Sequence, residues 1–559
     1  MDHLMKKRAV TLFWVFIFIF GGIIGHLAYI QVISGDRLSR QAIAQQSQSL
    51  ALEIPFRGEI LDRNLKPLNP YREVWRAAVF PALISDKTAA AALLAGVLGI
   101  DLREAENYLS GAPELIPVDL NNHQVGELRR KAITGIYPVT VKLRPRKPQL
   151  ASHIVGYLGR SSKPGGWAGE TGLEAYYDSE LQGQAPRSLI RVFLDGRGKH
   201  IAGLGHRVET GLTDKDRKDI VLTIDRDIQE TVERVLDRAG VKSGAAVVID
   251  PQTGDVLAMA SRPDYTLTSP AEPEKPDVDS FVYDSIYNPP SFLNNSLSLY
   301  QPGSVFKVIV AAAALEEGVV KPDTLFLCTG EKDELVKCYK EEGHGLITFS
   351  QAVAYSCNPT FARVGLKLGA QKLIAYAKKF GLADGGIIGY RGTSMEERVK
   401  RIGERYNLVN ASLGQWPVQA TAVQVASMMA AIANDGMYSP PRLVREIRGA
   451  NGQPARMIKP GPKTRAVSAE TAKIMQSLLE MTTRYGTGTK AWLEPWGSAG
   501  KTGSAQVGTE KIDAWFSGYA PVDNPRYVAA ILVTDGESGG TTAAPIFREI
   551  MQEILATGH

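Results

Sequence analysis

Ser304 and Lys307 stand one helical turn apart in the segment Gly-Ser-Val-Phe-Lys, a spacing suited to nucleophilic catalysis. A serine hydroxyl is a weak nucleophile until a base removes its proton, and a neutral lysine amine can be that base. Residues 308–315 are all apolar, so the predicted helix is apolar on every side and should be buried. Burial disfavours the charged form of lysine and lowers its pKa. The pattern therefore predicts an acyl-transfer site that works without histidine.

Two further polar clusters follow the serine–lysine pair along the chain. Ser-Cys-Asn occupies residues 356–358, and Lys-Thr-Gly-Ser occupies residues 501–504. Serine-x-x-lysine alone occurs by chance in many chains, and Lys-Thr-Gly alone is typical of an ordinary strand with a surface lysine. All three in this order are far more specific. The ordered set resembles that of the penicillin-binding proteins and serine β-lactamases.

The segment before these motifs carries a second resemblance. Residues 57–64, Arg-Gly-Glu-Ile-Leu-Asp-Arg-Asn, resemble the Arg-Gly-x-Ile-x-Asp-Arg-Asn signature of the class B, monofunctional penicillin-binding proteins. Residues 153–159 and 172–177 resemble two other pieces of the same non-catalytic module. We interpret this module as structural, because no nucleophile–base pair stands out in it. The charged residues expected to form an ion-pair network there are Arg57, Asp62, Arg63 and Glu174.

An apolar stretch near the N-terminus follows a basic flank. Residues 10–33 contain no Asp, Glu, Lys or Arg, and they are long enough to span a bilayer core of about 30 Å. Lys6, Lys7 and Arg8 precede the stretch, which favours a cytoplasmic N-terminus and a catalytic domain on the other side of the cell membrane. A cleaved signal peptide is the alternative, but the run is long for one and no convincing cleavage site follows it. We therefore expect a single-pass membrane protein.

The expected domain organisation follows from these assignments. It consists of a cytoplasmic tail at residues 1–9, a transmembrane anchor at 10–33, a pedestal of the dimerisation type at 34–215 and a transpeptidase domain at 216–559.

The hydrophobic patterns after residue 216 predict an α+β domain. Apolar runs typical of strands occupy residues 245–249, 256–260, 514–519 and 527–534, and the segment 304–440 between them is mostly helical. Strands at both ends of a domain with helices between them suggest one central antiparallel sheet flanked by helices. The transpeptidase fold implied by the resemblance has this arrangement.

The resemblance implies a peptidoglycan D,D-transpeptidase that uses a serine acyl-enzyme. Ser304 is expected to attack the carbonyl between two D-alanines of a donor stem peptide, with Lys307 accepting its proton. Lys307 must be neutral to do so, and both burial and a second positive charge at Lys501 favour the neutral form. Ser356 is expected to pass a proton to the departing amine, and Asn358 to hold Lys307 and the substrate amide.

The rest of the site is expected along the segment 501–504. Lys501 and Thr502 attract the terminal carboxylate of the substrate, and Gly503 leaves room for the substrate to lie as an added strand. The backbone N–H groups of Ser304 and Ser504 form the oxyanion hole. β-Lactam antibiotics are expected to acylate the same serine, and the chemistry requires no cofactor.

Three cysteines and one histidine form a separate group. Cys328, Cys338, His344 and Cys357 follow one another with nine, five and twelve residues between them. Structural zinc sites prefer four nitrogen or sulfur ligands, so this set predicts a structural zinc ion. A Cys328–Cys338 disulfide is the first alternative, since it suits a domain outside the cytoplasm. Three free thiols are the second.

Bulk composition is ordinary for a globular protein and limits other function classes. The chain has 559 residues and a net charge of +5, which we interpret as a solvated surface rather than a nucleic-acid-binding one. The expected partners are peptidoglycan stem peptides, β-lactams, the membrane and a polytopic glycan polymerase. The alternatives left open are a D,D-carboxypeptidase, a β-lactamase, a penicillin-sensing receptor and a catalytically minor scaffold for the polymerase.

Overall fold

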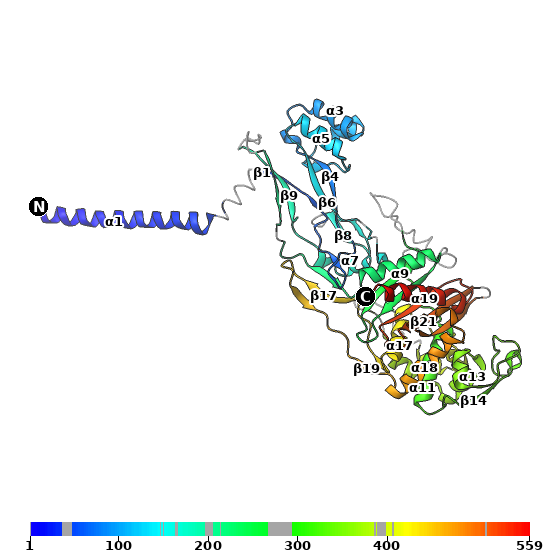
Figure 1. Cartoon of the computed structure of the whole chain (residues 1–559). Helices are drawn as coiled ribbons and strands as arrows, with labels where there is room; N and C mark the ends of the chain where they lie inside the picture. Colours follow the sequence, from blue (N-terminus) through cyan, green and yellow to red (C-terminus); the bar gives the residue numbers. More distant parts are fainter. Residues whose placement is uncertain are drawn as a thin grey trace. The chain divides into compact units, whose positions relative to one another are not determined.

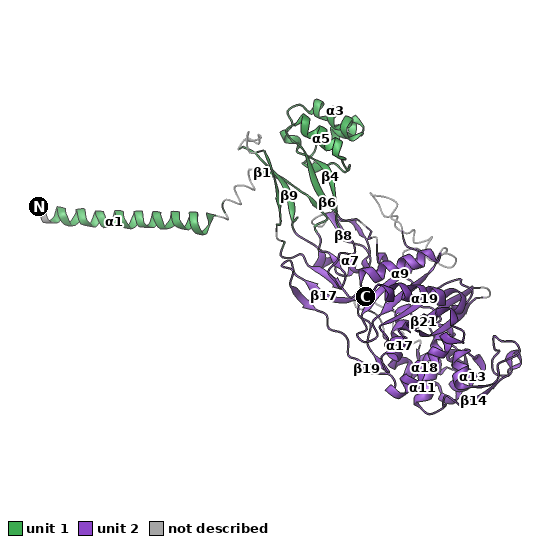
Figure 2. Ribbon diagram, in the orientation of Figure 1, with its two compact units in different colours: residues 1–56, 71–143, 185–214 green, residues 57–70, 144–184, 215–559 purple. Residues whose placement is uncertain are grey.

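The chain forms two compact units (Figure 2). The computed structural model describes residues 2–35, 38, 47–145, 147–148, 150–161, 166–195, 205–212, 214–265, 293–384, 387, 399–404, 407–508 and 511–558. The first unit comprises residues 1–56, 71–143 and 185–214, and the second comprises residues 57–70, 144–184 and 215–559. Residues 57–70 and 144–184, which we expected in the pedestal, thus belong to the same compact unit as the catalytic motifs.

A long N-terminal helix carries the apolar stretch (Figure 1). Helix α1 (Asp2–Ala28) continues into a π-helical turn, η1 (Tyr29–Ile33). The segment Leu4–Ile33 is 30 residues long and contains an 18-residue window with a mean hydropathy of 2.2, no part of which is buried by the described residues. At 1.5 Å per residue such a helix is about 45 Å long, which exceeds the bilayer core. By length and composition, it is the one helix among the described residues that fits a membrane span.

Apart from the N-terminal helix, the described residues of the first unit form two sheets and three short α-helices. The first sheet has the strand order β2 (Glu53–Ile54), β6 (Ile136–Leu143), β4 (Arg72–Val79) and β5 (Glu114–Leu115). The second has the order β1 (Ser47–Ala51), β9 (Ser188–Phe193) and β10 (His206–Thr210). Between β4 and β6 the chain forms α3 (Lys87–Leu98), α4 (Leu102–Tyr108) and α5 (Asn122–Lys131). Polar caps start these helices, as where Asp86 accepts a hydrogen bond from the Ala89 N–H.

A five-stranded antiparallel sheet forms the centre of the second unit. Its strand order is β13 (Val256–Arg262), β12 (Gly244–Ile249), β22 (Tyr527–Val533), β21 (Lys511–Ala520) and β20 (Ala499–Val507). Two strands come from the start of the domain and three from its end. The predicted α+β architecture, with a sheet built from both ends of the domain, is therefore confirmed. Strand β20, which carries the motif at residues 501–504, lies at the edge of the sheet.

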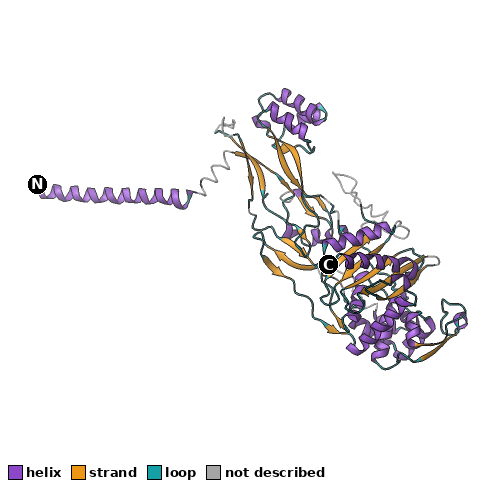
Figure 3. Ribbon diagram, viewed as in Figure 1, coloured by secondary structure: helices purple, strands orange, loops and turns teal. Residues whose placement is uncertain are grey.

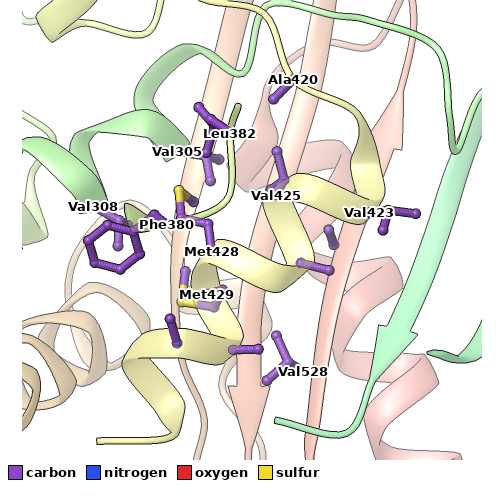
Figure 4. Packing of buried hydrophobic residues seen from close by; sticks show 14 of the residues in the cluster. Val305, Val308, Phe380, Leu382, Ala420, Val423, Val425, Met428, Met429 and Val528 are labelled. Atoms are coloured by element: carbon purple, nitrogen blue, oxygen red, sulfur yellow. The ribbon is translucent and has the colours of Figure 1, made fainter. Parts of the chain in front are cut away.

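Helices cover both faces of this sheet (Figure 3). Alternate side chains of each strand point to opposite faces, and on one face they pack against α9 (Arg226–Arg238) and α19 (Ala544–Ala556). On the other face they pack against α11 (Lys307–Glu316), α17 (Ala422–Ala433) and α18 (Ala469–Arg484). Every residue of α17 is buried. Figure 4 shows its Met428 and Met429 in the same apolar cluster as Val305, the residue that follows Ser304, and Val528 of β22.

The segment 304–440 is mostly helical, as predicted. Besides α11 and α17 it contains α12 (Phe349–Ala354), α13 (Asn358–Leu368), α14 (Ala370–Lys379) and α16 (Asn407–Ser412). A hairpin of β14 (Leu325–Cys328) and β15 (Gly345–Thr348) interrupts the helices and was not predicted. A second sheet of the unit has the order β18 (Pro454–Met457), β17 (Val444–Arg448), β11 (Asp219–Leu222) and β3 (Ile60–Leu61).

The expected ion-pair network exists, with different members. Arg57 contacts Glu174 at 2.9 Å and Asp178 at 2.6 Å, and Arg144 binds the other oxygen of Glu174. The prediction was wrong for Asp62, whose carboxylate accepts backbone N–H groups, including that of Asn64. A short carboxylate side chain near a turn satisfies its own backbone more easily than a distant cation. It was also wrong for Arg63, which forms no ion pair with any residue in the described ranges.

Candidate active site

The nucleophile candidate lies where a helix meets the edge strand. A short 3₁₀ turn, η4 (Gly303–Phe306), leads directly into α11, so Ser304 and Lys307 are positioned one turn apart as predicted. Gly303 has a φ of +54°, and a Cβ there would lie 3.1 Å from the backbone carbon of Ser504. Glycine permits both the left-handed backbone and this close approach. Ser304 is thereby held against the backbone of β20.

The Lys307 amine is enclosed by oxygen acceptors. It is only 1% exposed, and it donates to Asn358 Oδ1 at 2.7 Å, to the Ser356 carbonyl at 2.9 Å and to Ser356 Oγ at 3.3 Å. Ser356 has a φ of +54°, a conformation that a non-glycine residue adopts only when its surroundings impose it. Burial lowers the pKa of Lys307 to about 7. The structure thus gives this lysine the depressed pKa that the sequence predicted.

Lys501 is a second buried lysine close to the first. It is fully buried, and its Nζ donates to the Thr502 carbonyl at 3.2 Å. Burial lowers the pKa of Lys501 well below its usual range, and the positive charge of Lys307 lowers it further. Neither lysine forms an ion pair with a described residue. Repulsion between two cations is mutual, so the pair favours a state with fewer than two protons.

A cleft of about 590 Å³ opens beside Ser304. Of the predicted site residues, those that line it are Ser304, Ser356, Asn358, Thr502 and Ser504. Lys307 and Lys501 are buried behind this lining.

Gly503 has a structural role that differs from the one predicted. A Cβ on Gly503 would lie 2.6 Å from the Pro302 carbonyl oxygen and 2.9 Å from Val305 Cγ2. The space on that side of Gly503 is filled by the chain itself rather than left for substrate. Glycine at this position therefore lets β20 pack against the turn that carries Ser304.

Several lining residues were missed by sequence reasoning. The Thr487 hydroxyl lies 2.6 Å from the Thr502 hydroxyl, and Tyr339, Lys490 and Glu537 also line the cleft. They come from three separate segments and belong to none of the motifs. Only the fold brings them together, although the Gly-Thr-Gly sequence around Thr487 is a weak signal of a tight approach.

The cysteines and the histidine converge on one point. The ligand atoms of Cys328, Cys338, His344 and Cys357 all lie within 4.8 Å of one another. His344 Nδ1 lies 3.6 Å from Cys328 Sγ and 3.5 Å from Cys338 Sγ. All three cysteines are buried and free, so the structure contains no Cys328–Cys338 disulfide. The hairpin β14–β15, which sequence reasoning did not foresee, supplies Cys328 and brings His344 beside it.

Two protein-family models match separate parts of the chain. Residues 244–552 match the family model described as "Penicillin binding protein transpeptidase domain", which covers more than half of the sequence. The chain belongs to the penicillin-binding proteins. Residues 53–210 match "Penicillin-binding Protein dimerisation domain". The resemblance drawn from the motifs is thereby confirmed.

Two curated relatives of this penicillin-binding protein match it over nearly its whole length. Stage V sporulation protein D of Bacillus subtilis is 31% identical and covers 99% of this chain and 86% of its own. Peptidoglycan D,D-transpeptidase MrdA of Haemophilus influenzae is 26% identical over 99% of this chain and 92% of its own.

Among solved structures, one titled "Structural coordination of polymerization and crosslinking by a peptidoglycan synthase complex" matches with a TM-score of 0.72 and 26% identity. It covers 98% of this chain and 97% of the other. The D,D-transpeptidase domain of an Eggerthella lenta protein matches with a TM-score of 0.58 and 30% identity, over 75% and 93% of the two chains.

Proposed function

We propose that this penicillin-binding protein is a peptidoglycan D,D-transpeptidase that cross-links stem peptides through an acyl-enzyme on Ser304. The observation that carries the proposal is the buried Lys307 amine, one turn from Ser304, with a pKa lowered to about 7. A lysine of ordinary pKa would be fully protonated at neutral pH and could not act as a base. Relatives bearing the name peptidoglycan D,D-transpeptidase support the same reaction.

In the acylation step, Ser304 Oγ attacks the carbonyl carbon of the penultimate D-alanine, and Lys307 Nζ takes its proton. The tetrahedral intermediate collapses with cleavage of the C–N bond. The departing amine of the terminal D-alanine receives a proton from the Ser356 hydroxyl, which is replenished by Lys307 across the 3.3 Å contact. Asn358 Oδ1 accepts a hydrogen bond from Lys307 Nζ at 2.7 Å and holds this lysine amine in place.

The edge strand binds the donor. Among the described residues, strand β20 has no partner strand on its outer side, so an extended peptide can add to it by main-chain hydrogen bonds. The backbone N–H groups of Ser304 and Ser504 serve as the oxyanion hole, where one donor is worth about 3 kcal/mol. When Lys307 is neutral, a proton held by Lys501 supplies the positive charge that attracts the terminal carboxylate, together with the Thr502 hydroxyl. A β-lactam enters the same cleft and acylates the same serine.

Deacylation completes the cycle. An amine of a neighbouring stem peptide attacks the ester carbonyl and loses a proton to Lys307. The ester C–O bond breaks, and Lys307 returns that proton to Ser304 Oγ, which restores the free hydroxyl and the neutral amine. A D,D-carboxypeptidase would use water at this step instead. Supplying a donor peptide with and without an acceptor amine separates the two activities, because a transpeptidase makes the amide product and a carboxypeptidase makes only the free acid.

The nucleophile is tested by replacing Ser304 with alanine. Covalent labelling by a fluorescent penicillin should disappear in Ser304→Ala, while the unfolding temperature stays near that of the wild type. Ser350→Ala, which removes a hydroxyl bonded to the Pro322 carbonyl outside the cleft, is the matched control and should label normally. Labelling of Ser304→Ala at the wild-type rate would refute the assignment.

We also propose that Cys328, Cys338, His344 and Cys357 hold a structural zinc ion. Zinc bonds of about 2.0–2.3 Å in a tetrahedron place ligand atoms about 3.5–3.8 Å apart, close to the 3.6 and 3.5 Å between His344 Nδ1 and the sulfurs of Cys328 and Cys338. His344 Nε2 lies 3.4 Å from the Tyr339 hydroxyl, an outer partner that fixes the ring with Nδ1 toward the sulfurs. The ion would tie the β14–β15 hairpin to the start of α13 and thereby to Ser356 and Asn358.

Metal analysis of the purified protein tests this site. About one zinc per chain is expected, and His344→Ala should lower both the zinc content and the unfolding temperature. His26→Ala, in the apolar N-terminal helix, should change neither. Protein without zinc, in which two of the three thiols have formed a disulfide, would reject the metal.

The proposed topology places residues 1–9 in the cytoplasm, 10–33 in the membrane, and the pedestal (34–215) and transpeptidase domain (216–559) outside. The basic residues before the span and the exposed apolar helix support it. A polytopic glycan polymerase is the proposed membrane partner, by analogy with the synthase complex named above. Trypsin added to intact spheroplasts should degrade the bulk of the chain, whereas protection would contradict the orientation.

A further inference from the structure

The cleft carries a charge pattern that the proposed roles leave unused. Among the described residues that line it, Lys490 and Glu537 are the two with charged side chains, and both are exposed. Neither forms an ion pair with another described residue. An unpaired charge in a binding cleft is available to a ligand, whereas most exposed charges elsewhere on a protein surface are simply solvated.

The positive charge lies near the start of the edge strand's motif. Lys490 follows Thr487 by three residues, and the Thr487 hydroxyl lies 2.6 Å from that of Thr502. The buried Lys501 is the neighbour of Thr502 in β20. This end of the cleft is therefore the one suited to a carboxylate.

The negative charge lies farther along the same strand. Glu537 follows Gly536, whose N–H donates to the Ile512 carbonyl at 3.0 Å, and Ile512 pairs with Gln506 of β20. Gln506 lies four residue steps after Thr502 along the strand, a distance of about 13 Å. The two charged residues thus belong to segments that reach β20 at different points, that of Lys490 through Thr502 and that of Glu537 through Gln506.

Glu537 is exposed, but its backbone is fixed. Its N–H donates to Thr542 Oγ1 at 3.1 Å, and the next residue, Ser538, caps the turn η8 (Gly539–Ala543) by accepting from the Thr541 N–H. The turn continues into α19. The backbone that carries the Glu537 carboxylate therefore has a defined position at the cleft wall.

We propose that Glu537 recognises a cationic side chain on the donor peptide, in the residue that precedes the D-alanine pair. The inference rests on the proposed function, which puts the terminal carboxylate near Thr502 and the reacting carbonyl between Ser304 and Ser504. The peptide upstream of that carbonyl then runs toward Gln506 and reaches Glu537. A donor bound in the opposite direction would bring its carboxylate against Glu537, so the same charge also fixes the direction of binding.

Two synthetic donors test the proposal on the full-length protein in detergent. Each is a D-alanyl thioester preceded by lysine, with a free side-chain amine in one and an Nε-acetyl group in the other. Acylation forms the Ser304 ester and releases the thiol, which is measured directly. At low salt the wild type should be acylated roughly fivefold faster by the amine donor than by the acetylated one, the range of an exposed ion pair.

Substitutions of Glu537 should change this ratio in a charge-dependent way. Glu537→Gln should bring the ratio close to one, and Glu537→Lys should bring it below one. Asp535→Asn is the matched control, because it removes a negative charge two residues away that is paired with Lys511 outside the cleft lining; it should keep the wild-type preference. In the wild type itself, salt should reduce the ratio, since the pair is exposed to solvent.

The outcomes distinguish a failure of the proposed role of Glu537 from a failure of the proposed transpeptidase function. Equal ratios in the wild type and Glu537→Gln overturn the role of Glu537 alone, as does a parallel fall of both rates, which would indicate a structural effect. Failure of both donors to acylate wild-type Ser304 overturns the transpeptidase proposal and this inference with it.

Discussion

Two pairs of buried cations in the second unit lie in opposite environments. Arg57 and Arg144 have fully buried side chains, and both contact the Glu174 carboxylate. Lys307 and Lys501 are equally buried, but no carboxylate among the described residues pairs with either. The arginines keep their charge under all relevant conditions, whereas a lysine without a counter-ion can lose its proton.

This difference separates a structural use of charge from a chemical one. A buried ion pair fixes geometry, because removing one partner leaves the other charge uncompensated. A buried amine surrounded only by neutral acceptors is held in place and yet destabilised in its charged form. Perturbed pKa values of this kind are typical of functional sites. The comparison therefore predicts that the two pairs respond oppositely to substitution.

The largest expected effect is on acylation in Lys307→Met. Removing the base should slow penicillin acylation by about 10²–10⁴-fold, measured by stopped-flow labelling. The unfolding midpoint should not fall, because the substitution removes a buried amine that lacks a counter-ion. Lys332→Met, at an exposed position in the same unit, is the control and should label at the wild-type rate. A wild-type acylation rate in Lys307→Met would contradict the role of Lys307 as the base.

Substitution of the shared carboxylate should have the reverse profile. Glu174→Gln leaves two buried guanidinium groups without their common partner and should lower the free energy of unfolding by about 3–5 kcal/mol. The molecules that remain folded should still be acylated at nearly the normal rate. Glu334→Gln, which changes an exposed residue, should shift stability by less than about 0.5 kcal/mol. Denaturant titration measures the first quantity, and penicillin labelling of the folded fraction measures the second.

The pH dependence of acylation tests the lowered pKa of Lys307. Burial lowers the pKa of Lys307 from 10.5 to about 7, so the amine is protonated below that pH and neutral above it. The acylation rate should rise about tenfold between pH 6 and pH 8 and then level off, because only the neutral amine acts as a base. A rate that keeps rising to pH 10 would indicate a lysine of ordinary pKa.

The sequence predicted those parts of the site that depend on short-range spacing. Ser304 and Lys307 share a helix, so their distance follows from the helical repeat. The apolar run after them predicts burial, and burial is what lowers the pKa of Lys307. Four of the five strands of the antiparallel sheet could be predicted as well, because β13, β12, β22 and β21 each have a local apolar pattern. Strand β20 has no such pattern, since it carries the polar motif at residues 501–504.

Other features depend on long-range packing that spacing does not encode. Thr487 and Glu537 reach the cleft through loops that carry no periodic pattern. The role of Gly503 depends on the position of Pro302, about 200 residues earlier in the chain. Asp62 was misassigned for a similar reason, since whether an acid meets a cation or its own backbone is decided by the surrounding fold.

Direct titration of the Lys307 amine tests the central claim. The full-length protein would be labelled with ¹³Cε-lysine, and the Lys307 signal assigned by its absence in Lys307→Arg. We expect a midpoint for this signal at about pH 7, well separated from those of the exposed lysines. A midpoint near 10.5 would contradict it, because the amine would then be charged at the pH at which it must accept the serine proton.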